Sequence, residues 1–61
     1  MKADAAAQAT VLIIEDEADV LELIRYHLTK AGFRALIARD GKTGLEKAQS
    51  AGPDVIVLDL M

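Results

Sequence analysis

Residues 55–61 read Val-Ile-Val-Leu-Asp-Leu-Met, an apolar run that contains no turn residue and a single acid, Asp59. Short runs rich in Val and Ile are typical of buried β-strands. Because burial of an unpaired charge costs a large free energy, Asp59 is predicted to lie where the strand emerges, at the carboxyl end of a sheet. In open α/β sheets, ligands bind at that edge.

A run of the same kind occupies residues 10–14, Thr-Val-Leu-Ile-Ile, and predicts another buried strand. The acids Glu15, Asp16 and Glu17 follow it directly. Asp16 or Glu17 is expected to cap the next helix, since acids in a first turn suit the positive end of the helix dipole.

That helix is predicted over residues 18–31, and Gly32 is the expected left-handed residue that ends it. Residues 33–38 predict a strand, which Arg34 makes less apolar, as is typical of a sheet edge. The apolar positions of the helix recur at helical spacing and form its expected core stripe: Val20, Leu21, Ile24 and Leu28.

Asp40-Gly41 predicts a turn, and residues 42–51 predict a shorter helix with Leu45 and Ala48 turned inward. Gly52-Pro53 ends this helix before the strand at 55–61. The resulting β-α-β-α-β order with short connections implies an α/β fold with parallel strands and right-handed crossovers. The sequence resembles the first half of a doubly wound domain rather than a complete one.

Composition narrows the function classes. The chain has 61 residues, of which 52% are hydrophobic and 28% charged, as in a folded soluble domain. It has no cysteine, and no apolar run approaches the roughly 20 residues of a membrane span. A net charge of -3 with 3% aromatic residues argues against nucleic-acid binding. The Ala-rich residues 1–9 predict a disordered tail and lack the features of a signal peptide, which favours a cytoplasmic setting.

The acids form the candidate site. Parallel strands end at one edge, so Glu15, Asp16 and Asp59 converge if the strands at 10–14 and 55–61 are neighbours. Carboxylates at close range repel one another, and a divalent cation relieves that repulsion. Magnesium fits best, because it prefers carboxylates together with water and phosphate oxygens. A carboxylate beside it could act as a nucleophile towards a phosphoryl group.

Three segments carry a family resemblance: Val-Leu-Ile-Ile-Glu-Asp-Glu at 11–17, residues 38–48, and Pro-Asp-Val-Ile-Val-Leu-Asp-Leu-Met at 53–61. Together they resemble the receiver domain of two-component response regulators, above all members with a winged-helix DNA-binding output domain. The resemblance implies a truncated flavodoxin-like fold over residues 10–61, with strand order 2-1-3 of the family's 2-1-3-4-5.

The resemblance also implies residue roles. Asp59 would be the phosphoacceptor and would receive its phosphoryl group from a sensor histidine kinase. Asp16 would bind Mg2+ directly, Glu15 would reach it through water, and the backbone carbonyl of Met61 would be the remaining protein ligand. The family's strands 4 and 5, with their Ser/Thr switch and Lys, are absent from these 61 residues. The chain is therefore expected to be an impaired phosphoacceptor module, and not an enzyme.

Simpler interpretations of the same residues stay open at this stage. Asp59 could end its strand and cap a turn, Glu15 could be a solvated loop acid, and His27 is most simply a surface residue. A Rossmann-type nucleotide site is disfavoured, because Glu15-Asp16-Glu17 stands where the glycine-rich phosphate turn would have to be.

An alternative function is purely structural. An unpaired apolar strand at 55–61 is a template for pairing with another chain. Two copies could pair there about a two-fold axis and form a homodimer with a six-stranded sheet of order 2-1-3-3′-1′-2′. On this hypothesis the chain has no signalling activity of its own.

Overall fold

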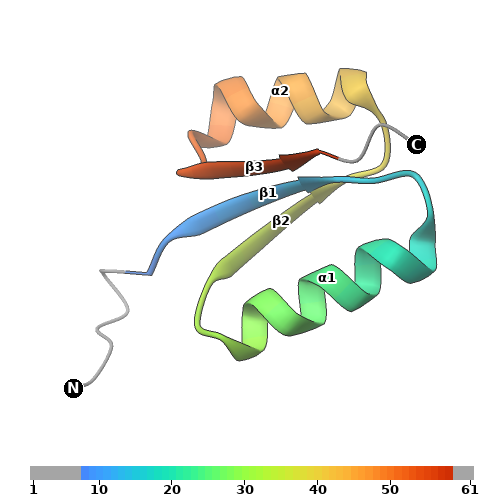
Figure 1. Ribbon diagram of the computed structural model, residues 1–61. Helices are drawn as coiled ribbons and strands as arrows, with labels where there is room; N and C mark the ends of the chain where they lie inside the picture. Colours follow the sequence, from blue (N-terminus) through green and yellow to red (C-terminus); the bar gives the residue numbers. More distant parts are fainter. Residues whose placement is uncertain (1–7, 59–61) are drawn as a thin grey trace.

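The structure is a computed structural model, and it describes residues 8–58. Three strands alternate with two helices along the chain, so the predicted β-α-β-α-β order is confirmed (Figure 1). Their bounds are β1 Thr10–Ile14, α1 Ala18–Lys30, β2 Arg34–Ala38, α2 Gly41–Ala51 and β3 Val55–Leu58.

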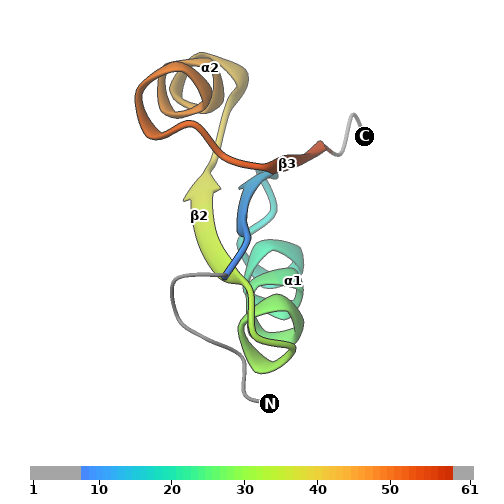
Figure 2. The same ribbon diagram turned by 90° about the vertical axis from the view of Figure 1, so that its left-hand side faces the viewer.

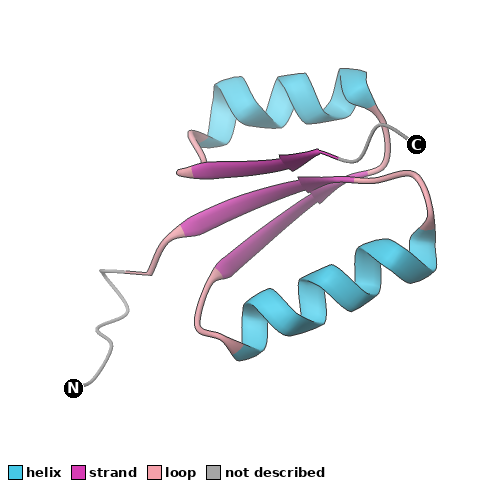
Figure 3. Cartoon of the chain, viewed as in Figure 1, coloured by secondary structure: helices cyan, strands magenta, loops and turns pink. Residues whose placement is uncertain are grey.

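The strands form one parallel sheet of order β2-β1-β3, which confirms the predicted truncated receiver-type fold. Both crossovers from strand to strand run through a helix, and the connecting loops are short (Figure 3). Seen along the sheet, α1 and α2 lie on opposite faces of it (Figure 2). A central β1 flanked by two strands is the arrangement that brings the ends of β1 and β3 to one edge.

The core lies on β1 and the face of α1 that covers it. Leu12 and Ile13 are fully buried, and Val11 and Leu21 are almost so. Full burial of an aliphatic side chain stabilises a fold by about 1.5–3 kcal/mol, so β1 carries much of the packing energy of this small sheet. Three of the four predicted stripe residues of α1 are confirmed, since Leu21 forms a cluster with Val11 and Ile13, and Ile24 and Leu28 pack against that cluster.

The end of α1 shows why the chain turns at Gly32. This glycine has φ +99°, the left-handed region that residues with a Cβ rarely adopt. Its N–H donates to the Thr29 carbonyl at 3.0 Å, and the Phe33 N–H donates to the Leu28 carbonyl at 2.9 Å. These two bonds form a Schellman motif. The helix ends at Lys30 and the strand begins at Arg34, each one residue from its predicted position.

Helix α2 begins one residue earlier than predicted, because Asp40 is its N-cap rather than part of a separate turn. The Asp40 carboxylate accepts a hydrogen bond from the Thr43 N–H at 2.8 Å. On the buried side of the helix, a Cβ placed on Gly44 would lie 2.8 Å from Cγ1 of Ile14 and closer still to Cδ1. The missing side chain therefore allows α2 to pack directly against β1.

This close packing makes Gly44→Ala destabilising. An added methyl group must displace Ile14, and overpacking of this kind typically costs about 1–3 kcal/mol. The better helix propensity of Ala returns about 1 kcal/mol, so we expect a net loss of about 1 kcal/mol in urea denaturation. In the double variant Gly44→Ala/Ile14→Val, the shorter side chain at position 14 should recover part of that loss, because it removes the Cδ1 atom nearest to the added methyl group. The matched control is Gly41→Ala, where nothing lies within 4 Å; an equal loss in that variant would contradict the packing argument.

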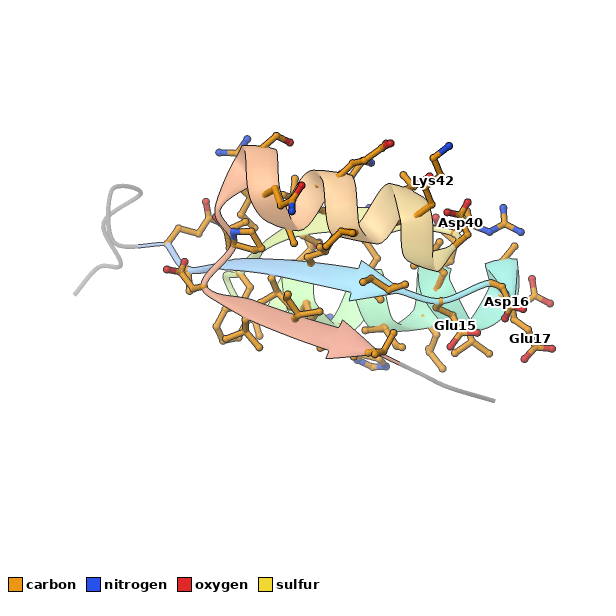
Figure 4. All side chains as sticks on the ribbon, turned by 90° about the horizontal axis from the view of Figure 1, so that it is seen from above. Glu15, Asp16, Glu17, Asp40 and Lys42 are labelled. Carbon is orange, nitrogen blue, oxygen red and sulfur yellow. The ribbon has the colours of Figure 1, made fainter. Side chains whose placement is uncertain are left out.

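Two sequence-based predictions about burial are wrong. Leu45 was expected to face inward but is 60% exposed, and β3 was expected to be buried, yet three of its four residues are about half exposed. Viewed from above, α2 is displaced away from β3, and β1 lies between them in this view (Figure 4). Helix α2 contacts β1 and β2, so within residues 8–58 it leaves β3 uncovered. The exposed residues of β3 are Val55, Ile56 and Leu58.

A pair of hydrogen bonds sets the register of β3 at its amino end. The Asp54 N–H donates to the Thr10 carbonyl, and the Thr10 N–H donates to the Asp54 carboxylate, both at 2.8 Å. From that point Val11 pairs with Val55, and the ladder continues to Ile14 and Leu58. The predicted division into a tail at 1–9 and a domain at 10–61 stays a prediction, because residues 1–7 and 59–61 lie outside the described part.

Candidate functional site

The candidate site lies beyond the last rung of the sheet. Ile14 in the centre pairs with Ala38 on one side and with Leu58 on the other. The next residues along the three strands are Glu15, Arg39 and Asp59. Two predicted site residues, Asp59 and Met61, fall outside the described residues. The description of the site is therefore built on the loop after β1 and the passage from β2 to α2.

Glu15 is a buried carboxylate at the end of the central strand. Its residue is only 3% exposed, so the alternative of a solvated loop acid is wrong. Its N–H donates to the Ala38 carbonyl at 3.0 Å, which continues the β1–β2 pairing by one residue. Its Oε2 atom accepts a hydrogen bond from the Glu17 N–H at 3.0 Å. Glu15 thus belongs to the folded rim of the sheet rather than to its solvated surface.

Asp16 and Glu17 are exposed, and Glu17 occupies the N-cap position of α1. The expectation that either acid caps the helix with its own side chain is wrong, because the Glu17 side chain makes no capping hydrogen bond. The carboxylate of Glu15 instead accepts from the Glu17 N–H. Figure 4 shows the three acids at the end of β1, where the strand leads into α1.

The passage from β2 to α2 reaches the same edge of the sheet. Asp40 and Lys42 lie there near the start of α2, across from the acids (Figure 4). The hydrogen bond from the Thr43 N–H holds the pKa of the Asp40 carboxyl below its usual range. Arg39 donates from Nη2 to the Asp16 carbonyl oxygen at 3.0 Å. This contact joins two loops 23 residues apart in sequence.

Arg39 and Lys47 make contacts that were not predicted from the sequence. Lys47 Nζ donates to the Ile37 carbonyl at 2.6 Å and so links α2 to β2. Each contact joins a long side chain to a backbone carbonyl on another element. No local pattern reports such a pair, since a carbonyl acceptor is present at every residue.

The donor chemistry of the edge suits a hard cation. Carboxylate oxygens are the protein ligands that Mg2+ prefers, and Glu15 and Asp16 supply two carboxylates at neighbouring positions. No cluster of three potential metal-binding side chains (His, Cys, Asp or Glu) occurs within residues 8–58. Two of the four predicted ligands, Asp59 and Met61, are outside that range.

His27 lies apart from this edge. It is exposed on α1, next to the ring of Tyr26 in an edge-to-face arrangement with centroids 5.4 Å apart. Its interpretation as a surface residue is confirmed. Neither described helix is long and apolar enough to cross a membrane.

Comparison with known proteins identifies the family. The profile described as "Response regulator receiver domain" matches residues 11–61. The chain belongs to this family. It is 39% identical over 51 residues to the alkaline phosphatase synthesis transcriptional regulatory protein PhoP of Bacillus subtilis, and 40% over 52 residues to the sensory transduction protein RegX3 of Mycobacterium tuberculosis. It is 43% identical over 51 residues to the response regulator ArlR of Staphylococcus epidermidis.

These matches cover 84–85% of this receiver chain but only 21–23% of each relative. The chain therefore spans about a fifth of the length of the curated relatives it matches. The resemblance inferred from residues 11–17, 38–48 and 53–61 is confirmed. A receiver domain is a signalling module. Membership in this family rules out the alternative of a Rossmann-type nucleotide-binding domain.

Proposed function

We propose that this receiver chain accepts a phosphoryl group on Asp59 from the phosphohistidine of a sensor histidine kinase. The supporting observation is the parallel register at the carboxyl edge. Ile14 pairs with Leu58, and Glu15 and Asp59 are the residues that follow this pair in the sequence.

In the proposed transfer, a carboxylate oxygen of Asp59 attacks phosphorus as the phosphorus–nitrogen bond of phosphohistidine breaks. The products are an acyl phosphate on Asp59 and a histidine whose imidazole takes up a proton. The reaction needs positioning and charge neutralisation more than further covalent chemistry. The nucleophile is the aspartate itself.

Mg2+ is the proposed cofactor, held by Asp16 directly, by Glu15 through water, and by Asp59 and the Met61 carbonyl. When bound, it would neutralise the phosphoryl oxygens as they approach an acidic edge. Of the chain's own residues, Glu15 would orient the loop through its bond to the Glu17 N–H, and Asp16 would present an exposed carboxylate.

Magnesium dependence tests this proposal. We expect acetyl phosphate to add a single phosphoryl group to a fraction of the chains in millimolar MgCl2, as seen by intact mass, because the chain is expected to be an impaired acceptor. An excess of chelator should remove at least nine-tenths of the labelling, because the acids then repel the phosphoryl donor. Restoring MgCl2 should restore it. Equal labelling with and without the chelator would contradict the metal role.

A second proposal concerns assembly. We infer that β3 of the 61-residue chain pairs with β3 of a second copy, because it is one of the two edge strands of the described sheet and three of its four residues are about half exposed. The two-fold arrangement of order 2-1-3-3′-1′-2′ is its expected form. Binding of the chain to nucleic acid or membranes is not proposed, and a cytoplasmic setting stays a prediction.

A further inference from the structure

Arg39 is the residue of the carboxyl edge that neither the fold nor the proposed phosphoryl transfer explains. It follows the last residue of β2, and its guanidinium is exposed yet hydrogen-bonded to the Asp16 carbonyl oxygen at 3.0 Å. The preceding residue, Ala38, accepts from the Glu15 N–H. The last residue of β2 and the residue after it are therefore hydrogen-bonded to the two residues that follow β1.

The loop that Arg39 contacts contains three adjacent acidic residues. It consists of three consecutive acids, Glu15–Glu17, between the end of β1 and the start of α1. One carboxylate of this loop is directed back to a loop N–H, as Glu15 accepts from Glu17. Like charges at neighbouring positions repel one another. A cation that also donates a hydrogen bond to the loop backbone opposes that repulsion and restricts the loop at the same time.

We propose that Arg39 is a positioning residue that holds the backbone of Asp16, and so directs the Asp16 carboxylate towards the divalent cation. The cation part of this inference rests on the proposed function, whereas the ordering of the loop does not. Arg39 acts through Asp16 and touches no reacting atom. A guanidinium suits this task because it donates from a planar, pre-organised fork.

Two effects of removing Arg39 oppose each other, and salt separates them. Loss of a positive charge beside the acids favours cation binding, whereas loss of the hydrogen bond to Asp16 disfavours it. At about 1 M salt the Debye length falls to about 3 Å, so the long-range charge effect is largely screened. A change in Mg2+ affinity that persists there reports the positioning effect.

The test compares Arg39→Met with the unaltered chain. The first readout needs no metal: amide hydrogen exchange at Glu17 should quicken by roughly threefold to tenfold, the range that loss of one hydrogen bond allows. The second is Mg2+ titration in 1 M NaCl, followed by amide chemical shifts, where affinity should fall by at least about threefold. Arg39→Lys keeps a cationic donor and should recover part of both effects.

Arg34→Met is the matched control. It removes the same charge from the opposite end of β2, where residue 34 is exposed, and should leave both readouts unchanged. Unaltered Glu17 exchange in Arg39→Met, or tighter Mg2+ binding at high salt, would overturn the proposal. If the unaltered chain binds no Mg2+, the proposed metal role fails, and the exchange rates alone decide whether Arg39 orders the loop.

Discussion

Asp59→Asn is expected to abolish phosphoryl labelling by acetyl phosphate or by a phosphorylated histidine kinase. Asn has the same shape as Asp, but its amide oxygen is a poor nucleophile and cannot form a stable acyl phosphate. We expect the labelling rate to fall below about one-hundredth of its original value, which corresponds to an increase of more than about 2.7 kcal/mol in the barrier. Intact mass measures the product, and hydroxylamine should remove the label as inorganic phosphate and leave a hydroxamate on residue 59, as it does with an acyl phosphate.

Asp54→Asn and Asp16→Asn are the controls for this result. Asp54 lies at the amino end of β3, where an Asn side chain can still accept from the Thr10 N–H, so labelling should be unchanged. Asp16→Asn removes a proposed ligand but not the acceptor, so part of its labelling should return at higher MgCl2. Equal labelling of Asp59→Asn and the unaltered chain would exclude Asp59 as the phosphoacceptor.

Ile56→Lys is expected to convert the 61-residue chain from a dimer to a monomer. Ile56 is 49% exposed on the edge strand, and a two-fold pairing of β3 would bring two copies of the new charge close together. Charged side chains on an edge strand are an established means of preventing pairing. Light scattering at micromolar concentration should show a mass of two chains for the unaltered sequence and of one chain for the variant.

Leu23→Lys is the matched control for the association experiment. Leu23 is an apolar residue of similar exposure, 58%, but it lies on α1 rather than on β3. Its substitution by Lys should therefore leave the dimer intact. A compact, folded monomer of the unaltered chain at micromolar concentration would refute the proposed pairing.

The fold could be predicted because its determinants are local. The β-branched runs at β1 and β3, the apolar spacing of α1 and the glycine at 32 each restrict the backbone without reference to distant residues. The exposure of Leu45 could not be predicted in this way. It depends on where α2 lies over the sheet, and that position follows from the fit of Gly44 against Ile14, a contact between residues 30 positions apart in the sequence.

The candidate site could be predicted from the sequence to about the same extent as the fold. The residue types and the carboxyl edge followed from the chemistry of acids after parallel strands, and the structure places Glu15 and Asp16 there. The burial of Glu15, its bond to the Glu17 N–H and the contact of Arg39 with Asp16 are tertiary features. The roles of Asp59 and Met61 stay predictions, since both residues are outside the described part of the chain.

The two hydrogen bonds between Thr10 and Asp54 fix the register of β3, and this register sets which residues face each other at the opposite end of the sheet. Side chains alternate between the two faces of a strand, so a slip of β3 by one position would exchange its faces. The same slip would carry the residue after Leu58 away from the level of Glu15. Breaking this contact, which is remote from the acids at residues 15–17, would thus impair the proposed phosphoryl acceptance by misalignment, with those acidic side chains still present.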